Sequence, residues 1–130
     1  MGFPSPAQDY VEGRLTLATL SRLNPNSTYL VRSASDYPAA GIKTGSILAV
    51  DRSIDPKHGH LIIAEIGGEF VIRRLLLKPF PALQELAGAQ TAHPLNNCPD
   101  VFNEEDSPVW GVVAYALTDV SGVGFSREVA

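Results

Sequence analysis

The sequence predicts a mostly β domain with one short helix, on two observations. Eleven glycines and ten prolines in 130 residues interrupt the chain too often for long helices. Two runs rich in β-forming residues, 61–66 and 69–75, flank Gly67-Gly68, a pattern typical of a β-hairpin. The chain is 45% hydrophobic and 18% charged, and its length suffices for one core. We therefore expect a single small globular domain.

Further strands are predicted at 27–32, 46–50 and 109–117, and loops at 41–45 and 51–59. Leucines at 15, 17, 20 and 23 have a partly helical spacing, so a helix is predicted over 14–23, ending at Asn24-Pro25-Asn26. The stretch 79–108 reads as irregular and polar. We divide the chain into an extended arm 1–13, a β domain 14–118 and a tail 119–130 that we expect to be loose.

Charge and targeting signals narrow the class of protein. The net charge of −4 argues against a broad phosphate-binding surface, so we expect no direct contact with nucleic acid. No apolar run approaches the ~20 residues of a membrane helix, and the N-terminus lacks the features of a signal peptide. A single cysteine, Cys98, excludes an intrachain disulfide. We expect a cytoplasmic protein that does not bind membranes.

The residues alone point to no clear chemistry. His58 and His60 are two apart and could share one face of a strand as zinc ligands, but no third ligand has a convincing spacing. We therefore predict two solvated histidines, no metal and no cofactor. His93 is expected to be exposed in its proline-rich loop. Cys98 lacks the helix N-terminus or cationic neighbour that would activate a thiol.

The order of several segments resembles the UmuD-like and LexA-like self-cleaving serine peptidases, family S24, of the bacterial SOS response. The match is densest over residues 2 to 80 and resumes over 104 to 117. The segments that carry it are 2–12 (GFPSPAQDYVE), 27–32 (STYLVR), 41–53 (GIKTGSILAVDRS), 56–64 (PKHGHLIIA), 68–75 (GEFVIRRL) and 110–113 (WGVV). The resemblance implies the family's peptidase-like fold of short, strongly bent strands.

The resemblance also implies a site in which a serine attacks a peptide bond of the protein's own arm while a neutral lysine takes the proton. The family's Gly-Asp-Ser-Met stretch corresponds here to residues 35–38, with one residue missing before Gly41, so Tyr37 occupies the serine position. Arg73 occupies the lysine position, and a guanidinium cannot serve as a base. We therefore expect no intact catalytic pair and a pseudo-peptidase rather than an enzyme. Tyr37 would pack its ring, and Arg73 would pair with an acid such as Asp36.

Other functions stay open. Ser35, or less directly Ser33, could act as the nucleophile of an active peptidase, although Lys43, Lys57 and Lys78 do not match the lysine position. The chain could also be a repressor-type dimerisation module without its DNA-binding domain, or a decayed gene product without a retained role.

The partners expected from the resemblance follow from where the sequence starts. Residues 2–12 resemble the segment directly after the UmuD self-cleavage site, so we expect the chain to correspond to the cleaved form. The resemblance then implies a homodimer, or a heterodimer with intact UmuD. Such a dimer serves as the accessory subunit of a UmuC-type translesion polymerase, and a RecA filament is a further candidate partner.

Overall fold

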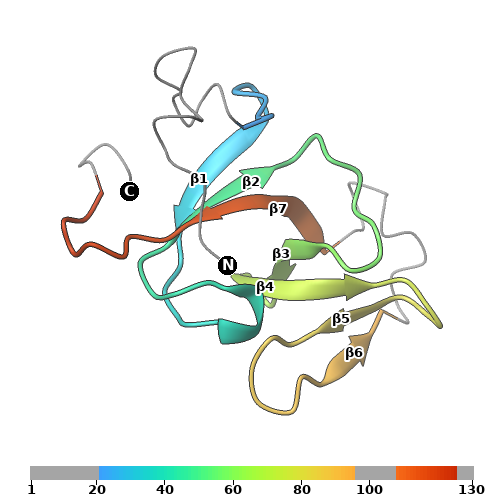
Figure 1. The fold of residues 1–130 in the computed structure, drawn as a ribbon. Helices are drawn as coiled ribbons and strands as arrows, with labels where there is room; N and C mark the ends of the chain where they lie inside the picture. The colour runs from blue at the N-terminus through green and yellow to red at the C-terminus, as the bar shows by residue number, and fades with distance from the viewer. Residues whose placement is uncertain (1–20, 96–107, 126–130) are drawn as a thin grey trace, which may run out of the picture.

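The computed structural model describes residues 21–95 and 108–125, and within them the chain forms one antiparallel sheet (Figure 1). The prediction of a mostly β domain is confirmed. The strands are β1 Thr28–Arg32, β2 Ile47–Asp51, β3 Leu61–Ile66, β4 Glu69–Leu76, β5 Ala82–Gln84, β6 Ala92–Pro94 and β7 Val109–Leu117, with a short 3-10 helix, η1, at Pro38–Ala40.

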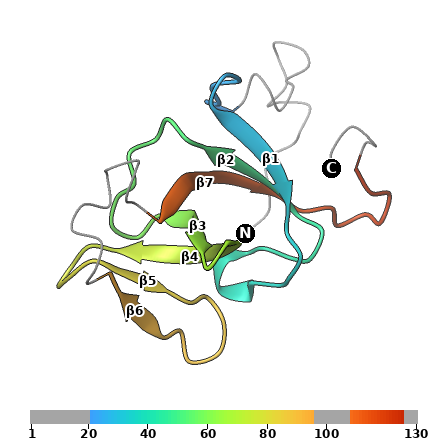
Figure 2. The same ribbon diagram turned by 180° about the vertical axis from the view of Figure 1, so that it is seen from behind.

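The strand order across the sheet is β1-β2-β7-β3-β4-β5-β6, so the last strand lies between β2 and β3. Both views place β1 at one side of the sheet and β5 and β6 at the other (Figures 1 and 2). The β3–β4 hairpin is confirmed: Ile66 pairs with Glu69 across Gly67 and Gly68, whose φ angles of 59° and 83° suit glycine. The register of β7 shifts against β2 at Ala49/Val50 and against β3 at Ile63/Ala64.

Side chains alternate between the two faces of the sheet and form two hydrophobic clusters. The first cluster contains the buried residues Ile42, Leu48, Val50, Ile63, Ile72 and Leu86. The second contains Ile62, Ala64, Leu75, Leu83 and Val112. Neighbours in sequence such as Ile62 and Ile63 belong to different clusters, as expected for a sheet buried on both faces.

Two expectations need comment. The stretch predicted as irregular, 79–108, contains β5 and β6, because Ala82 and Leu83 are buried where β5 pairs with β4. The predicted helix 14–23 lies outside the described residues except for 21–23, which are not helical, and the predicted arm 1–13 lies wholly outside them. No helix in the described ranges is long and apolar enough to cross a membrane.

The predicted tail is described as far as residue 125, and its first part carries a defined turn. Both carboxylate oxygens of Asp119 accept hydrogen bonds, from the backbone N–H groups of Ser121, Gly122 and Gly124 and from the Ser121 hydroxyl. These bonds hold the pKa of Asp119 below its usual value, the Ser121 hydroxyl contributing most. The division of the chain into arm, domain and tail stays a prediction.

Candidate functional site

The loop that joins β1 to β2 carries Tyr37, the residue aligned with the family serine. The backbone N–H of Tyr37 donates to the Ile42 carbonyl at 2.8 Å, and the Ile42 N–H donates to the Tyr37 carbonyl at 3.1 Å. Between them Pro38 opens η1, and Gly41 ends it with a φ of 71°. Ile42 is buried, and the half-buried Tyr37 packs against the same first cluster. The expected packing of the Tyr37 ring is confirmed.

Asp36, next to Tyr37, closes the loop. Its Oδ1 accepts hydrogen bonds from the Thr44 N–H at 2.7 Å and from the Thr44 hydroxyl at 2.8 Å. The Thr44 N–H is the main reason that the pKa of the Asp36 carboxyl lies below its usual value, followed by the Thr44 hydroxyl, with a smaller contribution from the charge of Lys43. Asp36 therefore stabilises the loop by joining its two ends through Thr44.

Arg73, the residue aligned with the family lysine, lies half-buried on β4. Its NH1 donates to the Ile72 carbonyl at 2.9 Å, and its NH2 lies 3.9 Å from Oε1 of Glu85. The other carboxylate oxygen of Glu85 lies 3.3 Å from Nε2 of His93. Arg73 therefore has the acidic partner that was expected, but the acid is Glu85, directly after β5, and not the suggested Asp36, which accepts hydrogen bonds from Thr44.

No hydrogen bond joins Tyr37 to Arg73 in the part of the chain that the structure describes. Tyr37 packs against the first hydrophobic cluster, whereas Arg73 is the β4 partner of Ile62, a member of the second. Within the described ranges, the Arg73 guanidinium donates a hydrogen bond to the Ile72 carbonyl and forms an ion pair with Glu85. The Arg73 Nε is buried without a hydrogen-bond partner there.

The two serines near Tyr37 differ in exposure. Ser33 is buried and its hydroxyl donates to the Ser35 carbonyl at 2.8 Å. Ser35 itself is exposed on the loop surface. Ser35 therefore has the more accessible hydroxyl of the two.

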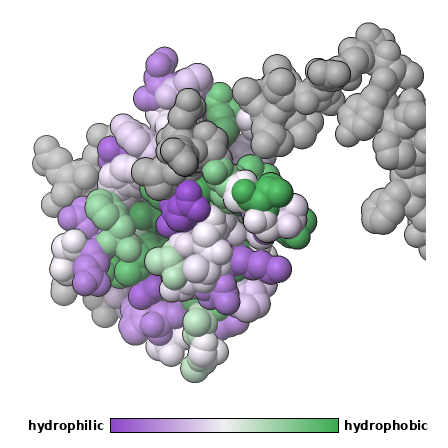
Figure 3. All heavy atoms as spheres, turned by 90° about the vertical axis from the view of Figure 1, so that its left-hand side faces the viewer, coloured by the Kyte–Doolittle hydropathy of each residue, from purple (hydrophilic) through white to green (hydrophobic). Residues whose placement is uncertain are grey.

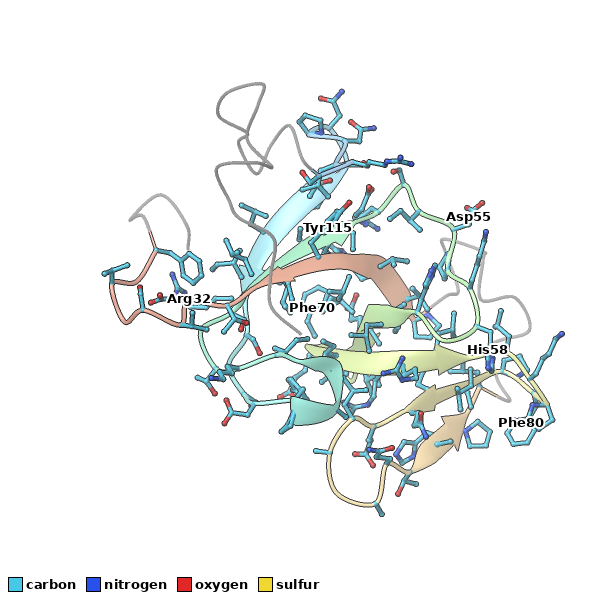
Figure 4. All side chains as sticks on the ribbon, viewed as in Figure 1. Arg32, Asp55, His58, Phe70, Phe80 and Tyr115 are labelled. Carbon is cyan, nitrogen blue, oxygen red and sulfur yellow. The ribbon has the colours of Figure 1, made fainter. Side chains whose placement is uncertain are left out.

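The candidate histidines lie elsewhere. Asp55 and His58 are at the end of the molecule opposite to Arg32 (Figure 4). Nδ1 of His58 accepts the Leu77 N–H at 2.9 Å, and Nδ1 of His60 accepts the Lys57 N–H at 3.0 Å. Both histidines thus accept a backbone hydrogen bond through Nδ1 and stabilise the neighbouring loops. The described part of the chain contains no group of three or more His, Cys, Asp or Glu side chains that could hold a metal ion. Cys98 lies outside it.

Aromatic side chains from three strands form a row that no motif in the sequence had predicted. The ring of Trp110 on β7 lies 5.1 Å from that of Tyr29 on β1 and 5.7 Å from that of Phe70 on β4. The Arg52 guanidinium lies 4.8 Å from the centre of the Trp110 ring, and its Nε donates to the Trp110 carbonyl at 2.9 Å. Tyr29 is 48% exposed and Phe70 60%. The row is therefore an exposed apolar surface held by ring contacts.

Comparisons with known proteins match most of the chain. Residues 1–86 match the family described as Peptidase S24-like. Protein ImpA of Salmonella typhimurium is 38% identical over 120 residues, which cover 89% of this chain and 76% of ImpA. Protein MucA of Escherichia coli is 37% identical over 123 residues, covering 91% of this chain and 78% of MucA. Protein SamA of Salmonella typhimurium is 36% identical over 113 residues, covering 86% and 74%.

These matches confirm the resemblance to UmuD-like proteins and support a role related to SOS mutagenesis. They also correct one expectation, that the chain is a pseudo-peptidase and no enzyme. The matched family is a peptidase family, the match includes positions 35, 37 and 73, and nothing in the described residues shows inactivity. The expectation was drawn from side-chain identities at two aligned positions, one of them beside a deletion. The chain belongs to the Peptidase S24-like family.

Proposed function

We propose that this chain acts in SOS mutagenesis as a dimeric subunit that binds a UmuC-type translesion polymerase. The observation that carries the proposal is the similarity to ImpA, 38% over 89% of the chain. It is supported by the UmuD-like segments, which occur in the same order along this chain. The dimer partner is a second copy or an intact UmuD, and the complex works in the cytoplasm.

The aromatic row supports binding of a protein partner. Exposed aromatic side chains are enriched at protein interfaces, where they lose little conformational entropy and bury much apolar area. Tyr29 and Phe70 are already held against Trp110, so their rings are arranged before a partner arrives. We propose that the polymerase contacts this row.

Replacing Phe70 by alanine tests the polymerase contact. Phe70 is 60% exposed, so the variant should keep the fold while losing an interface anchor. We expect Phe70→Ala to weaken binding to the purified UmuC-type polymerase about tenfold or more, the size of a typical hot-spot loss. Surface plasmon resonance with the polymerase immobilised would measure the affinity.

Ile66→Ala is the matched control for that measurement. Ile66 lies on the same hairpin and is 45% exposed. It pairs with Glu69, whereas Phe70 belongs to the next pair along the hairpin, with Glu65. Its side chain therefore points to the other face of the hairpin. Equal losses for the two variants would contradict a contact at the aromatic row, and no binding by the unmodified chain would contradict the polymerase partnership itself.

A second candidate function is peptidase activity, which the family match over residues 1–86 favours. The alignment of Tyr37 with the family serine and of Arg73 with the family lysine stays a proposal. As the nucleophile we propose Ser35, whose hydroxyl is on the exposed surface of the loop.

Incubation with an arm-bearing UmuD over a range of alkaline pH tests this activity. We expect cleavage of the arm, detected by mass spectrometry, and loss of that cleavage in Ser35→Ala. Ser33→Ala is the matched control, since Ser33 is buried and bound to the Ser35 carbonyl. Cleavage by Ser35→Ala at the unmodified rate would exclude Ser35, and intact substrate in every sample would exclude cleavage of this arm.

A further inference from the structure

The segment that follows β7 meets the sheet where the β1–β2 loop begins and ends. Both views of the ribbon place the start of this segment beside the end of β1 (Figures 1 and 2). Thr118 directly follows β7, and its hydroxyl oxygen lies 2.7 Å from that of Ser46, the residue before β2. The ring centre of Phe125 lies 6.0 Å from the guanidinium carbon of Arg32, the last residue of β1. The segment therefore contacts both residues that flank the loop.

Ser46 connects this segment to the inside of the loop. Ser46 is 1% exposed, and its hydroxyl accepts the Lys43 N–H at 3.1 Å, so its own hydrogen is available to Thr118. The main chain of Ser46 donates to the Lys43 carbonyl at 2.9 Å and accepts the Ser33 N–H at 2.8 Å. A buried hydroxyl without a partner costs free energy, so the Thr118 hydroxyl favours this arrangement of the loop.

The hydrogen bonds continue to Ser35, the nucleophile proposed above. The Gly45 N–H donates to the Ser33 carbonyl at 2.8 Å, and the Ser33 hydroxyl donates to the Ser35 carbonyl at 2.8 Å. A continuous path of hydrogen bonds thus runs from Thr118 through Ser46 and Ser33 to the backbone of Ser35. Fully paired networks of this kind make a structure more rigid. The contact at Thr118 should therefore restrict motion of the loop.

Between its two contacts the segment is ordered but exposed. The turn around Asp119 is extended by the Val123 N–H, which donates to the Ser121 hydroxyl at 3.1 Å. Val120 and Val123 are each 86% exposed. Figure 3 faces the side on which the segment lies in Figure 1, and hydrophobic residues are exposed there among polar ones. One hydroxyl pair and one ring contact are weak attachments, so the segment can detach without unfolding of the sheet.

We infer that residues 118–125 act as a strap that sets the mobility of the β1–β2 loop. When the strap is closed, Thr118 and Phe125 hold the two flanks of the loop. When it opens, the Ser46 hydroxyl loses Thr118 and the hydrogen bonds that lead to Ser35 weaken. The inference goes beyond the proposed function, because it requires neither a polymerase nor a peptide substrate. It gives the segment after β7 the role of controlling the loop of the candidate site.

Amide hydrogen exchange of the full chain, followed by NMR, tests the strap. Thr118→Val keeps the size of the side chain and removes its hydroxyl. We expect exchange of the Lys43 and Ser33 amides to become about tenfold faster, the size of effect expected when a buried polar group loses its partner. The Leu75 amide, on β4, should exchange at the unmodified rate. Thr118→Ser restores the hydroxyl and should restore slow exchange in the loop.

Thr28→Val is the matched control for that experiment. Thr28 lies on β1, and within the described ranges its hydroxyl is buried without a hydrogen-bond partner. The same replacement therefore breaks no hydrogen bond there. Loop exchange no faster in Thr118→Val than in Thr28→Val would overturn the inference. Equal acceleration at Leu75 would also overturn it, because the whole sheet and not the loop alone would then have lost stability.

Limited trypsin digestion tests the contact at Phe125. Phe125→Leu keeps an apolar side chain and removes the ring that faces Arg32. Cleavage after Lys43, which is exposed in the loop, should become about two- to fivefold faster, in line with the strength of such ring contacts. Cleavage after Lys57, exposed in the β2–β3 loop, should keep its rate. Mass spectrometry identifies the cuts. An unchanged rate at Lys43 would overturn the inference, because a segment held only at Thr118 is no strap.

Discussion

Replacing Gly111 by alanine should destabilise the fold by about 1–3 kcal/mol, the usual cost of overpacking a core. Gly111 is buried on β7, where it pairs with Ile63. A Cβ there would lie 2.7 Å from Cγ1 of Val50 and 3.3 Å from Cγ of Arg52. Val50 is fully buried and β-branched, so it has little freedom to move aside. Urea unfolding at fixed protein concentration would measure the loss.

A double-mutant cycle identifies Val50 as the cause. Val50→Ala removes the methyl that the new Cβ would meet, at the cost of a cavity. The double variant Gly111→Ala/Val50→Ala should therefore be more stable than the sum of the single losses predicts, by about 1 kcal/mol, within the range of coupling between contacting residues. Additive losses would show that the clash with Val50 does not explain the glycine.

The sequence predicts the local features of this fold better than its topology. The β3–β4 hairpin could be predicted because its pattern, two β-rich runs around Gly67-Gly68, lies in one continuous stretch of sequence. The position of β7 between β2 and β3 could not be predicted, because it depends on contacts between segments far apart in sequence. Strands β5 and β6 have three residues each, too few for a periodic pattern to show.

In the candidate site, too, local features could be predicted from the sequence and long-range contacts could not. Family resemblance located Tyr37 and Arg73, and the packing of Tyr37 could be expected because its loop leads back into the sheet. The pairing of Arg73 with Glu85 could not be predicted. Glu85 directly follows β5, and that stretch was predicted to be irregular. The aromatic row brings together three strands whose neighbourhood depends on the strand order and on ring contacts with Trp110.

Asp51 should make the stability of the protein dependent on pH in the acid range. It is buried at the end of β2, and its Oδ1 accepts hydrogen bonds from three groups. These are the Ser53 hydroxyl at 2.6 Å, the Ser53 N–H at 2.8 Å and the Ser27 hydroxyl at 2.8 Å. The Ser53 hydroxyl is the main cause that lowers the pKa of Asp51, assisted by the other two against the opposing effect of burial.

A lowered pKa in the folded state means that the ionised carboxylate stabilises the fold. The contribution is complete above the ordinary aspartate pKa, about 3.9, and disappears as the pH falls through the lower pKa of the folded protein. Asp51→Asn keeps the size of the side chain and removes the charge, so at neutral pH it should lose about 1–3 kcal/mol, the range for a hydrogen-bonded charged group. The difference from the unmodified protein should shrink as the pH falls below about 4.

Urea unfolding at a series of pH values between neutral and acid would measure both effects, with Asp55→Asn as the control. Asp55 is an exposed carboxylate in the loop that follows Asp51, so its replacement should change stability by no more than about 0.5 kcal/mol at any pH. The Ser27 bond also ties the residue before β1 to the end of β2, so Asp51→Asn should loosen the attachment of β1 to β2. A loss for Asp51→Asn that stays constant down to acid pH would show that shape rather than charge makes Asp51 stabilising.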